Sequence, residues 1–445
     1  MFGAPWWLAL LALVGALALA NLTISLFFAI GRRPGRTWAT ETPPVRSEAF
    51  LEAIAACVNG HAQLGGEATL LDNGDAYLPV ILETVAEARR SVNVMVYIWE
   101  PGVMSDRVFD ALIERARAGV QVRLLLDGLG GFRTPGSDIA RLEEAGGVVA
   151  RFRPIRFGLL TRFHKRNHRR AIVIDGRIGF TGGAAIGDKW LGNAQDPDHW
   201  RDSMVRVTGR LAANLQSAFS EVWAYCRGEI LAGADFFPEG GTAAEGDATA
   251  ASTAAVDSPT DGDVRHITVA SSPSGEEHPL RLFFLLTFLA ARERLWIATP
   301  YFVPDRHTRA AVAQKARDGL DVRLLLPNEL TDARPIRRTS HRYYDELLDA
   351  GVRIWEYQPT MMHAKHVVVD GHWSVVGSAN MDIRSKELNL ENVLGILDAG
   401  FAGQIERSFQ RDLDTAREIR LEEWRRRPFH DRVIERIAAL PSEQY

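Results

Sequence analysis

The chain contains little cysteine, which limits the chemistry that it can carry. Its 445 residues include two cysteines, Cys57 and Cys226, and neither lies in a CxxC pair or beside a histidine cluster. Metal sites built on thiolates depend on such close spacing. We therefore predict no metal site and no cofactor, and we interpret both thiols as structural residues.

The chain also lacks an excess of positive charge. Its formal net charge is -4 at pH 7 and its pI is about 6.3. Nucleic-acid binding through the overall field of a protein requires a basic surface, so no nucleic-acid partner is expected. A hydrophobic content of 46% with 24% charged residues is typical of a globular protein, and this length suits two domains.

One long apolar run lies at the amino end, from Trp6 to Ile30. About 20 apolar residues are enough to cross a bilayer, so the run predicts a transmembrane helix. A cleaved signal peptide is the alternative, but the run is longer than a usual signal core and follows no basic segment. Arg32, Arg33 and Arg36 come next. They predict a protein of the cell membrane whose bulk is cytoplasmic.

An internal duplication is the strongest sign of organisation. The segment Ala116–Leu126 reappears as Ala316–Leu326, and each copy reads as a helix end, a glycine and a buried apolar strand. Further helix and strand patterns follow in the same order in both halves. The sequence therefore predicts an α/β fold of two similar domains related by a pseudo-two-fold axis, with the active site at their interface.

Composition places the expected domain boundaries. Residues 233–263 are rich in Ala, Gly, Thr, Ser and Asp and read as a low-complexity linker. We predict a transmembrane anchor with its basic flank (1–36), a connecting segment (37–75), a first domain (76–232), the linker (233–263), and a second domain with a C-terminal helix (264–445).

Each half carries the same small cluster of polar residues. The first cluster is His168, Arg170 and Asp175, and the second is His363, Lys365 and Asp370. Strand side chains alternate between faces, so each histidine shares a face with its cation. The aspartate falls on the other parity and is followed by glycine, which is typical of a hairpin turn. We interpret the two aspartates as framework residues of the motif.

This pair of clusters points to phosphodiester chemistry. A neutral imidazole can act as a nucleophile and a protonated one as an acid, so two of them can divide these roles. A cation beside each would stabilise a phosphoryl-transfer transition state. Gly182 and Gly183, like Gly377 and Ser378, are small enough for phosphate oxygens to approach the backbone.

These residues resemble the duplicated His-x-Lys-x4-Asp signature of the phospholipase D superfamily. The likeness runs over nearly all of the chain after about Ala76 and is greatest to bacterial cardiolipin synthases. It includes the phrases Ala298–Pro304, Tyr357–Lys365 and Val375–Asp382. Such a set of phrases is far more specific than the short signature alone.

The resemblance implies a two-step reaction without metal, through a phosphatidyl-histidine intermediate. It implies His168 as nucleophile and His363 as acid/base, although the reverse order stays open. Arg170, Lys365 and Asn380 would bind phosphate with help from Ser378. By the same likeness, Asp202 and Glu391 would orient the histidines.

Two positions depart from the family pattern. Arg170 stands where the family has lysine, and Ala185 stands where it usually has asparagine. Arginine keeps the charge but its planar fork differs from a lysine tip, and alanine loses a polar contact. The first copy is therefore expected to be weakened or altered in preference rather than inactive.

Residues around the motifs receive a structural interpretation. His164, His366, His372 and His341 are off the pattern, and we expect surface or packing roles for them. A basic run of Arg162, Lys165, Arg166 and Arg169 precedes the first cluster and is expected to be a solvated loop.

Several functions remain in competition. The favoured one is a phosphatidyltransferase that makes cardiolipin and glycerol from two phosphatidylglycerols at a membrane. A phospholipase D that releases phosphatidic acid differs only in whether water attacks the intermediate. A nuclease of the same superfamily is disfavoured by the acidic pI and the apolar amino end. A catalytically dead lipid-binding membrane protein is the alternative outside enzymes.

Overall fold

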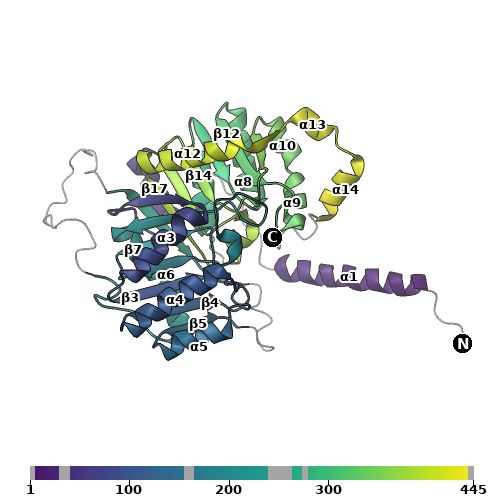
Figure 1. Ribbon diagram of the computed structural model, residues 1–445. Coiled ribbons are helices and arrows are strands. Elements are labelled where there is room, and N and C mark those ends of the chain that lie inside the picture. The colour runs from purple at the N-terminus through teal and green to yellow at the C-terminus, as the bar shows by residue number, and fades with distance from the viewer. Residues whose placement is uncertain (1–5, 30–40, 155–164, 239–262, 273–278, 439–445) are drawn as a thin grey trace, which may run out of the picture.

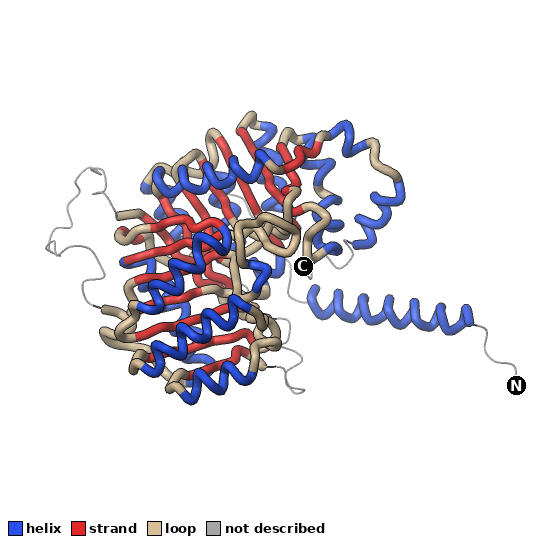
Figure 2. Tube along the Cα trace, in the orientation of Figure 1, coloured by secondary structure: helices blue, strands red, loops and turns tan. Residues whose placement is uncertain are grey.

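A computed structural model describes residues 6–29, 41–154, 165–238, 263–272 and 279–438. Most of the predicted linker and the three arginines after the apolar run lie outside these residues. The described part is built on two β-sheets with helices on their faces (Figures 1 and 2). It is the mixed α/β fold of two similar domains that the duplication predicts.

The first sheet has seven strands in the order β2-β8-β7-β6-β3-β4-β5. Strands β3, β4 and β5 run parallel, and the remaining neighbours pair antiparallel. Buried Val, Leu and Ile fill the central strands, as a sheet covered on both faces requires. The strands are β2 (Ala68–Asp72), β3 (Ser91–Val96), β4 (Gln121–Asp127), β5 (Val148–Phe152), β6 (Ala171–Ile174), β7 (Ile178–Gly182) and β8 (Ser203–Thr208).

The second sheet repeats this topology within nine strands, in the order β1-β9-β17-β15-β14-β10-β12-β13-β18. From β9 to β13 each strand has a counterpart of the same direction in the first sheet. Its strands are β1 (Gln63–Leu64), β9 (Arg265–Ser271), β10 (Arg294–Ala298), β12 (Asp321–Pro327), β13 (Arg353–Tyr357), β14 (His366–Val369), β15 (Trp373–Gly377), β17 (Glu391–Leu397) and β18 (Ala416–Ile419). A separate pair joins β11 (Phe302–Val303) to β16 (Met381–Asp382).

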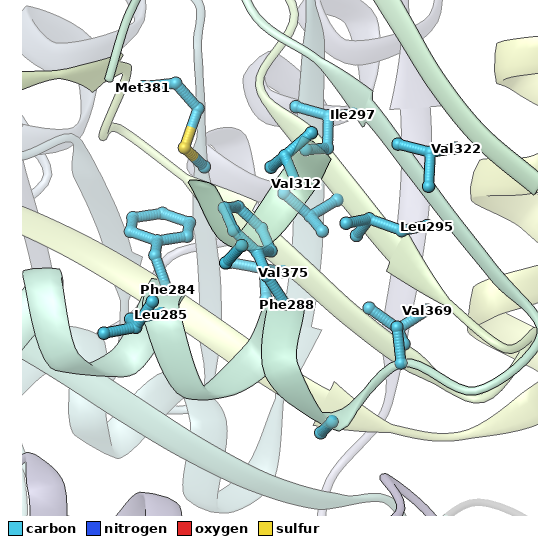
Figure 3. Packing of buried hydrophobic residues seen from close by; sticks show 14 of the residues in the cluster. Phe284, Leu285, Phe288, Leu295, Ile297, Val312, Val322, Val369, Val375 and Met381 are labelled. Atoms are coloured by element: carbon cyan, nitrogen blue, oxygen red, sulfur yellow. The ribbon is translucent and has the colours of Figure 1, made fainter. Parts of the chain in front are cut away.

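Helices cover the outer faces of both sheets. Helices α3 (Asn73–Ala86), α4 (Val103–Arg117) and α5 (Gly136–Glu144) lie side by side on the first sheet (Figure 1). Helix α7 (Pro279–Ala290) packs Phe284 and Phe288 against the second sheet near Val375 (Figure 3). The other helices of the body are α2 (Glu48–Cys57), α8 (Arg306–Arg317), α9 (Arg334–His341), α10 (Tyr344–Asp349), α11 (Ile383–Glu387), α13 (Leu421–Arg425) and α14 (Phe429–Ala438).

Two long helices join the halves through one shared core. Helix α6 (Gly209–Arg227) follows β8, and its counterpart α12 (Ala399–Asp414) follows β17. Apolar side chains of both helices, such as Phe219 and Phe409, belong to a single buried cluster that includes strands of both sheets. Burial of apolar surface of this kind is the dominant force in association. It holds the two sheets in a fixed relation and so positions the site between them.

The apolar run at the amino end forms helix α1 (Trp6–Ala29), which extends away from the body (Figure 1). Large apolar side chains on it are exposed, including Trp6, Leu11 and Leu19. Within the described part of the chain, no helix combines the length and hydropathy needed to cross a membrane. The helix is therefore found where the sequence predicts one, but the predicted transmembrane span is not supported.

Candidate active site

The two motif aspartates lie in hairpin turns rather than among reacting groups. Asp175 and Asp370 have φ of 53° and 51°, a region that aspartate tolerates. The Asp175 carboxylate accepts hydrogen bonds from the backbone N–H groups of residues 89, 90 and 91, and Asp370 does the same for residues 292, 293 and 294. Each aspartate thus ties the motif hairpin to the neighbouring strand, β3 or β10.

His168 of the first half is held by an acid of the second half. Its Nδ1 lies 3.0 Å from one carboxylate oxygen of Glu391 and 3.1 Å from the other. The Ser378 hydroxyl donates a 2.5 Å hydrogen bond to the same carboxylate. An Nδ1–H that faces a carboxylate leaves the Nε2 lone pair free, which is the tautomer that a nucleophile requires.

His363 is held in the mirrored way by an acid of the first half. Its Nδ1 lies 2.5 Å from Asp202 Oδ2, and the indole N–H of Trp190 donates to that same oxygen over 3.0 Å. The Trp200 ring stands beside this imidazole, with centroids 5.3 Å apart. Both predicted orienting acids are therefore in contact with histidines, and each contact crosses between halves.

Backbone pairing between the halves produces this exchange of acids. Asn167, just before His168, forms an isolated parallel bridge with Leu390, just before Glu391. Met362, just before His363, forms the same bridge with Arg201, just before Asp202. Side chains one residue beyond each bridge must then lie side by side. The two bridges are related by the pseudo-two-fold axis, and so are the two acid–histidine pairs.

The cations lie next to their own histidines, as predicted, but these residues precede β6 and β14 instead of lying within these strands. Lys365 Nζ donates to the His363 carbonyl over 2.9 Å and lies 3.3 Å from its Nδ1. Arg170 Nη1 lies 3.3 Å from the His168 carbonyl and 3.5 Å from its Nδ1. Asn392 of the second half binds both backbone groups of Arg170 at 2.9 Å. Asn392 was not predicted from the sequence. The one feature that could have indicated it is its position directly after Glu391.

Burial lowers the pKa of three central groups of the site. It lowers the pKa of His363 to about 4, with the charge of Lys365 adding to the effect. It lowers the pKa of Lys365 to about 7, and the nearby Arg170 guanidinium contributes. The pKa of His168 is also lowered by burial, which outweighs the opposing pull of Glu391. Both imidazoles are therefore neutral at pH 7 until an anion enters.

A cavity of about 520 Å³ opens onto both histidines. Its wall includes Arg170 and Asn380, two of the residues expected to bind phosphate. The other lining residues are Tyr97, Ile98, Trp200, Tyr301, Asp332, Ile336, Asp382, Arg384, Ser385, Leu388 and Asn389. None of these lining residues was predicted from the sequence as a substrate contact, because they come from separate loops, short helices and strand ends whose approach to the histidines no periodic pattern reveals.

The small residues serve a different purpose from the one predicted. A Cβ on Gly183 would lie 2.1 Å from Asp202 Oδ1, and one on Gly182 would lie 2.3 Å from the Ser203 carbonyl. The space beside these glycines is therefore filled by the acid that orients His363, and neither glycine lines the cavity. Ser378 stands at the position equivalent to Gly183, and its hydroxyl holds Glu391.

The basic run before the first cluster is not a solvated loop where it is described. Arg166 and Arg169 are 1% and 0% exposed. Arg169 donates to Glu221 and to the Ser271 carbonyl of the second half, while Arg166 pairs with Asp127 at 3.5 Å. These contacts hold the segment around His168 in place. The prediction of a solvated loop is therefore wrong for Arg166 and Arg169. Arg162 and His164 lie outside the described residues.

The other histidines have mixed surroundings. His341 and His366 are buried, each 5% exposed, whereas His372 is half-buried in the turn after Asp370. His341 Nε2 lies 3.1 Å from Glu356, away from the cavity. These placements agree with the packing roles that the sequence suggests.

A family model and individual relatives that match this chain are all described as cardiolipin synthases. The family model described as "Cardiolipin synthase, PLD-like domain" matches residues 81–223 and 285–413. Cardiolipin synthase 2 of Bacillus anthracis is 34% identical over 377 residues, which cover 84% of this chain and 70% of that protein. Cardiolipin synthase A of Pseudomonas syringae pv. syringae is 34% identical over 402 residues, with 89% and 79% covered.

A solved structure shares the fold. The phosphatidylserine synthase of Haemophilus influenzae Rd KW20 superposes with a TM-score of 0.62 at 16% identity, covering 85% of this chain and 95% of that one. At this identity the likeness concerns the fold alone. It extends over 85% of this chain and therefore includes both sheets.

Proposed function

We propose that this chain, a phosphatidyltransferase of the phospholipase D superfamily and of the cardiolipin synthase type, makes cardiolipin and glycerol from two phosphatidylglycerols. The single observation that supports this chemistry best is that two histidines, each paired with an acid of the other half, face the same cavity. Both imidazoles open onto one cavity, each with a cation beside it and an acid on its Nδ1.

In the first step, Nε2 of His168 attacks the phosphorus of the donor lipid. The bond from phosphorus to the glycerol oxygen breaks as the nitrogen–phosphorus bond forms, and His363 gives its proton to the departing oxygen. The products are a phosphatidyl-histidine and free glycerol. Arg170 and Lys365 balance the charge on the non-bridging phosphate oxygens. The carboxylate of Glu391 stabilises the positive charge that develops on His168.

In the second step, the hydroxyl of another phosphatidylglycerol enters in place of glycerol. His363, now neutral, removes the proton from that hydroxyl as its oxygen attacks phosphorus. The bond to His168 breaks, cardiolipin is released, and both histidines return to their starting state. Asp202 faces His363 Nδ1 and stabilises the imidazolium form of this ring before the first step and after the second.

Substrate binding favours the uptake, from solvent, of the proton that His363 needs for the first step. Burial keeps His363 neutral in the empty pocket, with a pKa of about 4. A phosphodiester anion beside His363 favours the charged form of this ring, because an opposite charge within about 4–6 Å stabilises the protonated group. The acid therefore becomes competent only when substrate is present.

We also propose that the protein works at the cell membrane, where its lipid substrates reside. The exposed apolar side chains of α1 support a contact with lipid. Burial of such side chains in a bilayer is favourable at about 25 cal/mol per Å². Deletion of residues 1–30 should then lower co-flotation with phosphatidylglycerol vesicles while turnover in detergent micelles persists.

One assay tests the proposed reaction. The purified chain receives phosphatidylglycerol in mixed micelles, and the products are followed over time. Cardiolipin and glycerol in equal amounts are expected, and both His168→Ala and His363→Ala should abolish them. Phosphatidic acid as the sole lipid product would replace the proposal with hydrolysis. Unimpaired turnover in either variant would end the two-histidine scheme.

A further inference from the structure

The wall of the cavity breaks the pseudo-two-fold symmetry that the histidines obey. Two parallel bridges fix the equivalent positions: Trp99 pairs with Ile186 in the first half, and Phe302 pairs with Met381 in the second. The residues beside these bridges are therefore counterparts. Ile98 corresponds to Tyr301, Ala185 to Asn380, and Gly187 to Asp382. By the bridges next to the histidines, Trp200 corresponds to Asn389.

All four pairs differ in the same direction. The first half contributes an apolar or small residue at each position, and the second half contributes a polar one. Tyr301, Asn380, Asp382 and Asn389 all line the cavity, as do Ile98 and Trp200 opposite them. We call the four second-half residues, together with Asp332, the polar wall.

The polar wall presents hydrogen-bond acceptors whose capacity is unmet. The amide oxygens of Asn380 and Asn389 are buried, and neither has a hydrogen-bond partner among the described residues. The two side chains are only 4% and 6% exposed, and both line the cavity, so a ligand group held there lies beside them. Buried polar groups without partners are costly and point to a ligand that completes them.

The Asp332 carboxylate provides further hydrogen-bond acceptors in the cavity. The Tyr301 hydroxyl donates to Asp332 at 2.7 and 2.9 Å from its two oxygens, and both residues line the cavity. Each carboxylate oxygen has more than one lone pair, so Asp332 can accept from a ligand as well. The phenol oxygen can do the same.

Acceptors select for a ligand that carries O–H or N–H groups. An ionised phosphodiester has no such group and needs donors, which Arg170 and Lys365 provide. The NH2 group of Asn380 can also donate to phosphate, while its oxygen remains an acceptor. An acyl chain cannot satisfy buried amide oxygens. The part of the substrate that does carry donors is the alcohol, and a polyol such as glycerol carries several.

We propose that the polar wall is the binding site for the polyol headgroup, and that it selects glycerol-type alcohols over simple alcohols in both steps of the reaction. On the first-half side, the Ile98 and Trp200 side chains offer hydroxyl groups no acceptor and leave their surfaces to the lipid portion, while the Tyr97 ring lies against His168. The proposal rests on the proposed phosphatidyl transfer and adds the residues that decide which alcohol is used.

The test compares two alcohols of the same carbon skeleton. The full chain in mixed micelles receives phosphatidylglycerol labelled in its acyl chains, with isotopically labelled glycerol and 1-propanol at equal concentration. Both alcohols compete for one phosphatidyl-enzyme, so the ratio of labelled phosphatidylglycerol to phosphatidylpropanol reports the acceptor step alone. Changes in donor binding or in the amount of folded enzyme cancel in this ratio.

Asn389→Leu and Tyr301→Phe are expected to lower the glycerol-to-propanol ratio, by about tenfold for the buried amide. Asp332→Asn should lower it as well. Tyr225→Phe at an exposed surface position is the matched control for Tyr301→Phe, and its ratio should equal that of the unmodified protein.

An unchanged ratio in the active members of the three polar-wall variants would overturn the proposal. A fall of both products in the same proportion would do so too, since it would mean general damage to the site. Failure of the proposed function looks different: the unmodified protein would then form neither phosphatidylpropanol nor labelled phosphatidylglycerol.

Discussion

The Nδ1 of His168 and the carboxylate of Glu391 lie 3.0 Å apart although 223 residues separate them in the chain. In the equivalent pair, His363 belongs to the second half and its acid, Asp202, belongs to the first half. Neither half therefore carries a complete, oriented histidine of its own. The site exists only when both halves are folded and docked.

Glu391→Gln should lower turnover by at least about 100-fold, because an amide does not stabilise an imidazolium and can hold the wrong tautomer. The variant keeps the size of the side chain, so substrate affinity should change far less than kcat. Initial rates of cardiolipin formation measure both quantities. Glu418→Gln, which removes an acid of an exposed pair with Arg353, is the matched control and should retain its rate.

Lys365→Arg should change the pH profile. The pKa of Lys365 is lowered to about 7, so the lysine loses its charge, and with it phosphate binding, as the pH rises above 7. Since kcat/KM reports the free enzyme, it should fall on this alkaline limb. Arginine stays charged, and the limb should move beyond pH 9 even if the maximum is lower. An identical limb in both proteins would assign the titration to another group.

Asp370→Ala should lower stability without a matching loss of chemistry. The carboxylate accepts three backbone N–H groups and is 4% exposed, so its removal leaves buried donors unpaired and should cost about 2–4 kcal/mol. Calorimetry should show a lower Tm, and kcat per folded molecule should stay within about threefold. A large loss of kcat at an unchanged Tm would instead indicate a direct catalytic part for this aspartate.

His266→Gln should reduce the loss of stability in acid. Burial lowers the pKa of His266 to about 4, whereas an unfolded histidine titrates near 6.5. Between these values the unfolded chain binds the extra proton, so stability falls as the pH drops from about 6.5 to 4. The slope of Tm against pH in this window should be shallower in the variant. The exposed His61→Gln should leave the slope as it is.

Much of the fold could be read from local patterns. The repeat of Ala116–Leu126 at Ala316–Leu326 predicts two similar halves, and the two sheets share one strand order. The burial of Arg166 and Arg169 could not be predicted from the local sequence. A basic run is usually solvated, but here partners from distant segments, Asp127 and Glu221, make burial favourable. The length of the apolar run was likewise not enough to establish a transmembrane span.

What the sequence determined by itself is the content of each motif. The spacing of two residues puts His168 with Arg170 and His363 with Lys365 in the segments just before β6 and β14. The Asp-Gly pairs place Asp175 and Asp370 in the hairpin turns. The tertiary structure alone decided which acid meets which histidine and which wall of the cavity is polar. Those features depend on contacts between halves, through the bridges at Leu390 and Arg201 and the shared core of α6 and α12. Spacing along one chain carries no record of such contacts.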